Sequence, residues 1–125
     1  LSHIADDVQV ILTSTKVRAA QTADIAGQAL GLEPQVLPVL AHEDTAAIFS
    51  ALRERDEDVV MIVGHEPTFS RMIELIAFGK ATGTVDMKKA GCARLDLDLT
   101  GTRHPPRGTL LWLATPKMLR KIGRD

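Results

Sequence analysis

Two basic residues, Arg18 and His65, are the strongest candidates for chemistry in this 125-residue chain. Each follows a short apolar run and precedes a helical pattern, in the segments 13–23 (TSTKVRAAQTA) and 63–67 (VGHEP). In an open parallel α/β sheet, ligands bind outside the carboxyl ends of the strands. Helix N-termini at that edge favour anions. A guanidinium group and an imidazole in one such crevice predict the binding of a phosphoryl group.

Each of these residues also has a plainer interpretation. Arg18 is expected in the first turn of its helix, where a cation opposes the helix dipole by about 0.3–1 kcal/mol. A bound anion would compensate this mismatch, whereas the alternative is a solvated surface arginine. His65 follows Gly64, which permits a close backbone approach, but the imidazole could simply satisfy a loop carbonyl. Glu66 could be a general acid, a surface charge, or the donor of a backbone N–H to a phosphate.

Other polar clusters are more simply explained without a ligand. His42, Glu43 and Asp44 are adjacent at an expected helix start, and such neighbours rarely converge on one metal ion, while Asp44 suits an N-cap. Arg103-His104 lies in a Pro-rich turn. The Lys88-Lys89 pair and the basic tail are interpreted as solvated faces; the tail residues are Lys117, Arg120, Lys121 and Arg124. The sequence contains no P-loop, dinucleotide fingerprint, zinc spacing or nucleophile elbow.

Composition indicates one globular domain spanning residues 1–125. The chain is 45% hydrophobic and 25% charged, and its net charge of −1 gives no general attraction to nucleic acid or anionic lipid. One cysteine, Cys92, excludes an internal disulfide and fits a reducing compartment, so we expect a cytoplasmic protein. No apolar stretch approaches the length of a membrane span, and no signal peptide is visible.

Hydrophobic periodicity predicts alternating strands and helices. The predicted strands are residues 9–13, 35–40, 59–63, 92–99 and 109–114, and the predicted helices are 16–30, 44–55, 67–78 and a short basic one from Thr115. Pro38 assigns the second strand to an edge. The run 59–63 is apolar throughout, which predicts a central parallel strand, whereas the alternation in 92–99 predicts antiparallel pairing. The order β-α-β-α-β-α-β-β-α predicts a three-layer α/β/α domain with a mostly parallel sheet and one antiparallel strand.

Finer expectations concern the helix ends and faces. Ser14 or Thr15 is expected to cap the first helix, and Gly31 to end it. Val17, Ala20, Ala23 and either Ala26 or Ala29 are expected on its small-residue face, which would lie against the sheet.

The segments LTSTKVRAAQTA (12–23) and VGHEP (63–67), with LLWLATP (110–116), resemble the histidine phosphatase superfamily, which has the phosphoglycerate-mutase-like fold. The similarity extends from about residue 8 to 119, and the SixA-type phosphohistidine phosphatases are the most similar branch. The resemblance implies a metal-independent, cofactor-free phosphatase with a histidine nucleophile in an Arg-His-Gly motif. Arg18 would clamp the phosphoryl oxygens, and His65 would hydrogen-bond the transferring group.

The resemblance implies a protein bearing phosphohistidine as the substrate. A small phosphate ester is the alternative substrate, and a non-catalytic phosphate-binding or interaction module is the alternative function. The short insertion between Leu40 and Val59 would leave the crevice open, which favours the protein substrate. Neither nucleic acid nor a membrane is expected as a partner.

The chain departs from the family in one respect, because it contains no Arg-His-Gly. Arg103-His104-Pro105 lies in the wrong element to replace it. In the family, the strand that ends in this motif lies between the strands that match residues 59–63 and 92–99. We therefore expect the chain, which starts at Leu1, to be an N-terminally incomplete phosphatase domain that lacks the first strand and the nucleophile.

Overall fold

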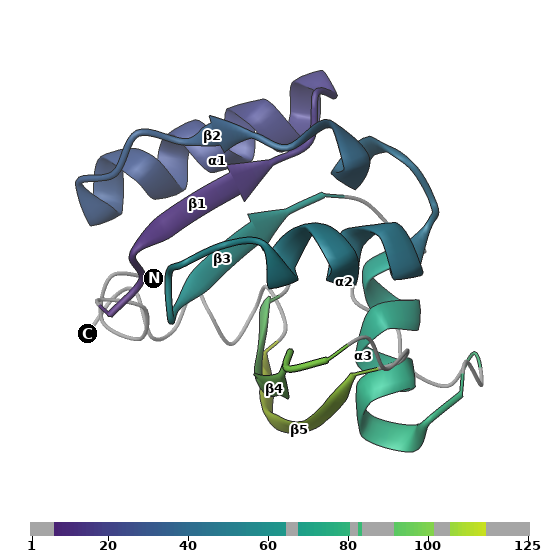
Figure 1. Cartoon of the computed structure of the whole chain (residues 1–125). Helices are drawn as coiled ribbons and strands as arrows, with labels where there is room; N and C mark the ends of the chain where they lie inside the picture. The colour runs from purple at the N-terminus through teal and green to yellow at the C-terminus, as the bar shows by residue number, and fades with distance from the viewer. Residues whose placement is uncertain (1–6, 65–67, 81–82, 84–91, 102–105, 115–125) are drawn as a thin grey trace. The chain divides into compact units, whose positions relative to one another are not determined.

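The computed structural model describes residues 7–64, 68–80, 83, 92–101 and 106–114, and shows a mixed α/β protein (Figure 1). Its elements, in chain order, are β1 (Val10–Thr13), α1 (Val17–Leu30), β2 (Gln35–Val36), the 3-10 helix η1 (Pro38–Ala41), α2 (Thr45–Arg53), β3 (Val60–Val63), α3 (Thr68–Phe78), β4 (Cys92–Asp98) and β5 (Arg107–Ala114). This order confirms the predicted one as far as β5. The helix expected from Thr115 lies outside the described residues. The elements form two compact units, of which the first contains β1, α1, β2, η1 and β3, and the second contains α2, α3, β4 and β5.

The first unit is built on a parallel sheet with the strand order β2-β1-β3. β1 lies in the middle, and all four of its residues are buried. Gln9 connects the amino ends of β1 and β3, because its side-chain Oε1 accepts the N–H groups of Asp58 at 2.6 Å and Val59 at 3.0 Å. The parallel arrangement and the edge position of β2 are therefore as predicted.

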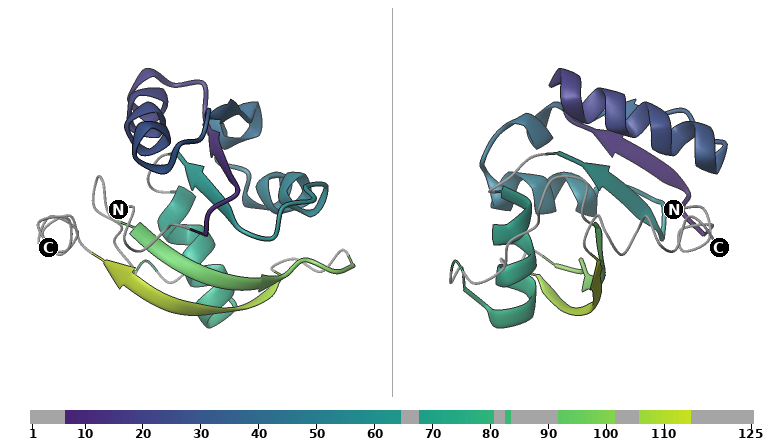
Figure 2. Two further views of the ribbon diagram at one scale, coloured as in Figure 1. Left: turned by 90° about the vertical axis from the view of Figure 1, so that its left-hand side faces the viewer. Right: turned by 180° about the vertical axis from the view of Figure 1, so that it is seen from behind.

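α1 covers one face of this sheet through its smallest residues (Figure 2). Ala23 and Ala26 pack with Ile11 in a core that Met61 and Val63 of β3 border. Small side chains allow the helix axis to lie close to the strands. Val17, which was expected on this face, is instead 70% exposed, so that prediction was wrong.

The end of α1 follows the predicted pattern. Gly31 is the C-cap, with a left-handed φ of 69°, and its N–H donates to the carbonyl of Gly27. Leu32 N–H donates to the same carbonyl at 3.0 Å. A glycine reaches this conformation without the steric penalty of a Cβ, which explains why the helix stops here.

Two strand predictions need correction. The strand expected over residues 35–40 ends at Val36, because Pro38 has no N–H for a ladder and instead opens η1. β3 was expected to be a central strand, yet among the described strands only β1 pairs with it, and its four residues are half-buried. The central strand of this sheet is β1. An apolar run indicates that the side chains of a strand are shielded from water. It does not indicate whether one or two neighbouring strands pair with it.

The second unit contains an antiparallel pair, β4 and β5, as the alternation in residues 92–99 predicted. In the part of the chain that the structure describes, this pair is separate from the sheet of the first unit, so the single mixed sheet is not observed. α3 lies against β5 at Gly108. A Cβ on Gly108 would lie 2.8 Å from Ile76 Cγ2 and 2.5 Å from the carbonyl oxygen of Asp96. The missing side chain is therefore what allows this close helix–strand contact.

The helices of the second unit have polar residues at defined positions. Asp44 is the N-cap of α2, and its Oδ1 accepts the N–H of Ala47 at 3.0 Å, as predicted. Ile48 and Phe49 are buried on the inner side of that helix. Glu74 of α3 is only 1% exposed and accepts the N–H of Gly83 at 3.1 Å. This buried carboxylate therefore anchors the chain beyond the end of α3.

Candidate phosphate site at the carboxyl edge of the sheet

The two strands that precede Arg18 and His65 are direct neighbours and end side by side. Thr13, the last residue of β1, is paired with Val63, the last residue of β3. Ser14 N–H extends this contact by donating to the carbonyl of Val63 at 3.1 Å. On the other side of β1, Leu37 N–H donates to the carbonyl of Thr13 at 2.8 Å. All three strands of the sheet therefore end at one edge, toward which the arrowheads of β1 and β3 point in Figure 1.

The turn between β1 and α1 is held from inside. Ser14 is fully buried, and its Oγ accepts the N–H of Lys16 at 3.3 Å. Thr13 Oγ1 donates to the carbonyl of Ser14 at 3.2 Å. The N-cap of α1 is Lys16, which makes no side-chain cap bond, so the prediction of Ser14 or Thr15 as the cap was wrong. Nothing in the sequence marks Lys16 as a cap, because lysine has no acceptor for the first N–H groups of a helix.

Arg18 is the second residue of α1 and is exposed at the sheet's carboxyl edge. Its backbone carbonyl accepts the hydroxyl of Thr22 at 3.0 Å. The first turn of α1 contains no acidic residue, and the described residues give Arg18 no ion pair. The positive end of the helix dipole and the guanidinium group are thus adjacent without a compensating anion.

Charges in the first unit are divided between the two ends of its strands. In the first unit, the segments just before the strands (residues 7–9, 31–34 and 56–59) hold no lysine or arginine, although Arg55 directly precedes the last of them; their acidic members are Asp7, Glu33, Asp56, Glu57 and Asp58. The described segments after the strands, residues 14–18, 37–42 and 64, hold Lys16, Arg18 and His42 and no acidic residue. This polarity favours an anion at the carboxyl edge and disfavours one at the opposite edge.

His65 and Glu66, the other predicted site residues, lie outside the described residues. Gly64 is the last residue described before them, directly after Val63. The structure thus brings together the two strand ends from which Arg18 and His65 emerge. A direct approach of the two side chains stays a prediction.

The adjacent residues His42, Glu43 and Asp44 have different roles in the structure. Asp44 caps α2, and Glu43 Oε2 lies 4.0 Å from Arg71 Nη1. His42 follows η1 in the first unit and is exposed. Over the described ranges, no three histidine, cysteine or acidic side chains gather as a metal site would require. None of the described helices has the length and apolar character needed to cross a membrane.

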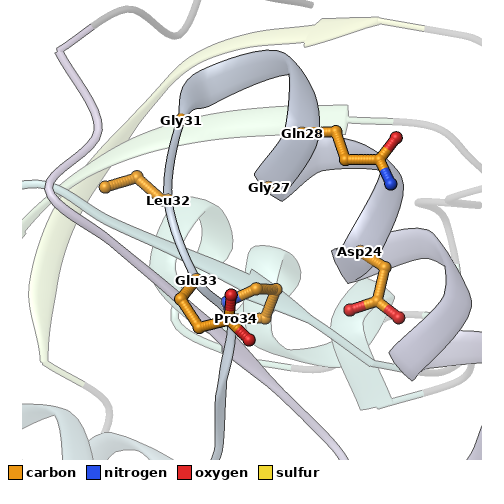
Figure 3. Close-up of a pocket in the computed structure, with 7 residues that line it drawn as sticks. All are labelled: Asp24, Gly27, Gln28, Gly31, Leu32, Glu33 and Pro34. Atoms are coloured by element: carbon orange, nitrogen blue, oxygen red, sulfur yellow. The ribbon is translucent and has the colours of Figure 1, made fainter.

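A hollow of about 510 Å³ opens at the other end of α1 (Figure 3). Its lining residues are Asp24, Gly27, Gln28, Gly31, Leu32, Glu33 and Pro34. Arg18 and Gly31 are separated by roughly 20 Å along the helix at 1.5 Å per residue. The hollow is formed by the C-cap turn and lined by two carboxylates, so it is a separate feature from the basic edge.

Comparison with known proteins gives a relative from Picosynechococcus sp. (strain ATCC 27264 / PCC 7002 / PR-6), described as "Uncharacterized protein SYNPCC7002_A2622". The two proteins are 37% identical in an alignment of 114 positions that covers 87% of this chain and 69% of the relative. The chain belongs to the family of this cyanobacterial protein. No protein-family model matches the chain. The relative's name states no activity, so a function for the family has to be argued from its residues.

Proposed function

We propose that the chain is the phosphoryl-binding part of a cytoplasmic phosphatase of the histidine phosphatase superfamily, with the three-layer phosphoglycerate-mutase-like fold. Its substrate is phosphohistidine in a protein. The observation that carries this proposal is the pairing of Thr13 with Val63, because it makes Arg18 and His65 follow adjacent ends of two parallel strands. The basic carboxyl edge supports the same proposal, since a phosphoryl group carries negative charge.

Each residue of the site has a separate role in this reaction. The planar guanidinium of Arg18 binds two phosphoryl oxygens at once. His65 donates a hydrogen bond to the same group, and Glu66 contributes its backbone N–H. A histidine nucleophile attacks phosphorus, the P–N bond to the substrate imidazole breaks, and water then hydrolyses the phosphohistidine of the enzyme. Catalysis therefore comes from positioning and from charge stabilisation, without a metal or cofactor.

The nucleophile of this mechanism is not among the 125 residues, which contain no Arg-His-Gly. We propose that a strand carrying this motif pairs with the edge of β3 that no described strand occupies. The strand would then end next to His65, so that the nucleophile faces the phosphoryl group bound by Arg18.

The chain between β2 and β3 supports a protein substrate over a small phosphate ester. Only η1 and α2, of four and nine residues, form regular structure there. A short connection offers little chain that could close over the crevice, so a large substrate retains access. An imidazole leaving group also needs less help from a general acid than an alkoxide does.

The test uses a protein in which an Arg-His-Gly segment precedes residues 1–125. We expect it to release phosphate from a phosphohistidine-bearing protein and to remain active in the presence of a chelator. His65→Ala should lower turnover by about a hundredfold or more, as the loss of an oxyanion-type donor does. His104→Ala, which is outside the proposed site, is the matched control. Full activity of His65→Ala would refute the role of His65, and complete loss with the chelator would refute the metal-free mechanism.

A non-catalytic phosphate-binding module is the second candidate, and the absence of Arg-His-Gly from the chain favours it. The same experiment separates the two functions. If no upstream Arg-His-Gly is encoded and the protein binds phosphate through Arg18 without turnover, the binding module is the correct function.

A further inference from the structure

We propose that His42 is a third residue of the phosphoryl-binding edge and contacts the bound group from the β2 side of Arg18. This inference rests on the proposed function, because it adds a residue to the same site. β1 lies between β2 and β3, so the segment that carries Arg18 begins between the ends of β2 and β3. His65 follows β3 on one side, and His42 follows β2 on the other.

The position of His42 follows from the way β2 ends. Val36 is paired with Thr13, and the Leu37 N–H bond to the Thr13 carbonyl holds the exit of β2 against the exit of β1. Neighbouring strands lie about 4.8 Å apart. The four residues of η1 rise only about 8 Å at 2 Å per residue. η1 and the beginning of α1 lie at the same end of the sheet in Figures 1 and 2.

The chemistry of His42 is not used elsewhere in the described residues. Its backbone N–H donates to the carbonyl of Val39 at 3.2 Å, which ends η1, and the side chain is exposed. Its two neighbours are occupied, because Glu43 faces Arg71 and Asp44 caps α2. A neutral imidazole has one N–H donor, and a protonated one has two.

The segments that carry Arg18 and His42 lack carboxylates, although Glu43 and Asp44 follow His42 directly. The segment 37–42 contains no acidic residue, and neither does the segment 14–18 that carries Lys16 and Arg18. An anion bound to Arg18 therefore meets no described carboxylate in either segment. The donor that a phosphoryl oxygen would meet on the β2 side is His42.

The experiment titrates the protein with inorganic phosphate and follows the imidazole signals by NMR. The chain has four histidines, so single His→Gln variants assign each signal. The His42 signal should move with the same saturation curve as the backbone amide of Arg18. His42→Gln should weaken phosphate binding roughly three- to tenfold, the range expected for one neutral hydrogen bond. His104→Gln is the matched control and should bind as the unchanged protein does.

The outcomes separate this inference from the proposed function. If Arg18→Ala weakens binding by about tenfold or more while His42→Gln binds phosphate normally and the His42 signal does not move, only the inference about His42 is wrong. If Arg18→Ala binds phosphate normally, the proposed site itself is wrong, and the inference falls with it. Circular dichroism and the thermal midpoint of each variant establish that the loss of binding is not a loss of folding.

Discussion

Replacing Arg18 with alanine tests the phosphate site most directly. Arg18 is exposed in the first turn of α1, where no acidic residue opposes a bound anion. Hydrogen bonds to charged groups contribute about 1.5–3 kcal/mol each when they are removed. Because the site is open to water, we expect a single loss of this size and not the sum over two oxygens. At 1.4 kcal/mol per factor of ten, Arg18→Ala should weaken phosphate or vanadate binding by roughly tenfold to a hundredfold.

The assay is isothermal titration calorimetry with vanadate or inorganic phosphate at low ionic strength. Arg71→Ala is the matched control, because it removes the same charge from an exposed helix position in the second unit, where Arg71 faces only Glu43 at 4.0 Å. Arg18→Lys should restore part of the affinity, since an ammonium group lacks the planar fork of arginine. Equal affinities for Arg18→Ala and Arg71→Ala would refute the reasoning, because the effect would then come from net charge alone.

Three further predictions concern the fold. Gly108→Ala should lower the free energy of unfolding by about 1–3 kcal/mol, measured by chemical denaturation, because the new Cβ would overlap Ile76 and the Asp96 carbonyl; an unchanged midpoint would show that α3 and β5 do not pack this closely. Gly31→Ala should lower it by about 1–2 kcal/mol through its positive φ alone, since nothing lies within 4 Å of its Cβ position. Residues 1–125 expressed alone should unfold with low stability or form dimers, because one edge of β3 has no partner among the described strands; a monomer with a steep, cooperative transition in sedimentation and denaturation experiments would contradict the expected missing strand.

Local sequence signals predicted the elements whose ends are set by a single residue. Gly31 ends α1 because it alone tolerates the left-handed C-cap, and Asp44 starts α2 because its carboxylate accepts an N–H of the first turn. The cap of α1 was missed for the opposite reason. Ser14 is a good capping residue by type, but it lies two residues before the N-cap Lys16, is buried, and holds the strand–helix turn from inside. The residue type of Ser14 therefore predicted a polar contact with a nearby backbone N–H. Because α1 begins later than expected, that N–H belongs to Lys16 and not to the first turn of the helix.

The candidate site could also be predicted only in part, because some of its features depend on the local sequence and others on which strands pair. The sequence places Arg18 and His65 after two strands, and the general rule for parallel sheets assigns both to the carboxyl edge. Periodicity contains no information on which strands are neighbours, so the direct pairing of Thr13 with Val63 could not be predicted from it. The division of charge between the two ends of the strands could not be predicted either. Acidic and basic segments alternate along the chain, and they come to opposite edges of the sheet only when the strands align.

The position of β3 links the fold to the chemistry. Its four residues are as apolar as those of β1, yet they are half-buried where those of β1 are buried. β1 has a neighbour on each side, whereas β3 has a described neighbour on one side only. A strand edge without a partner leaves a row of backbone N–H and C=O groups that an added strand can pair. A parallel strand added at the open edge would satisfy β3 and would also end beside His65. Under the proposed function, one strand with a nucleophilic residue at its carboxyl end would both pair with the edge of β3 that no described strand occupies and supply the nucleophile.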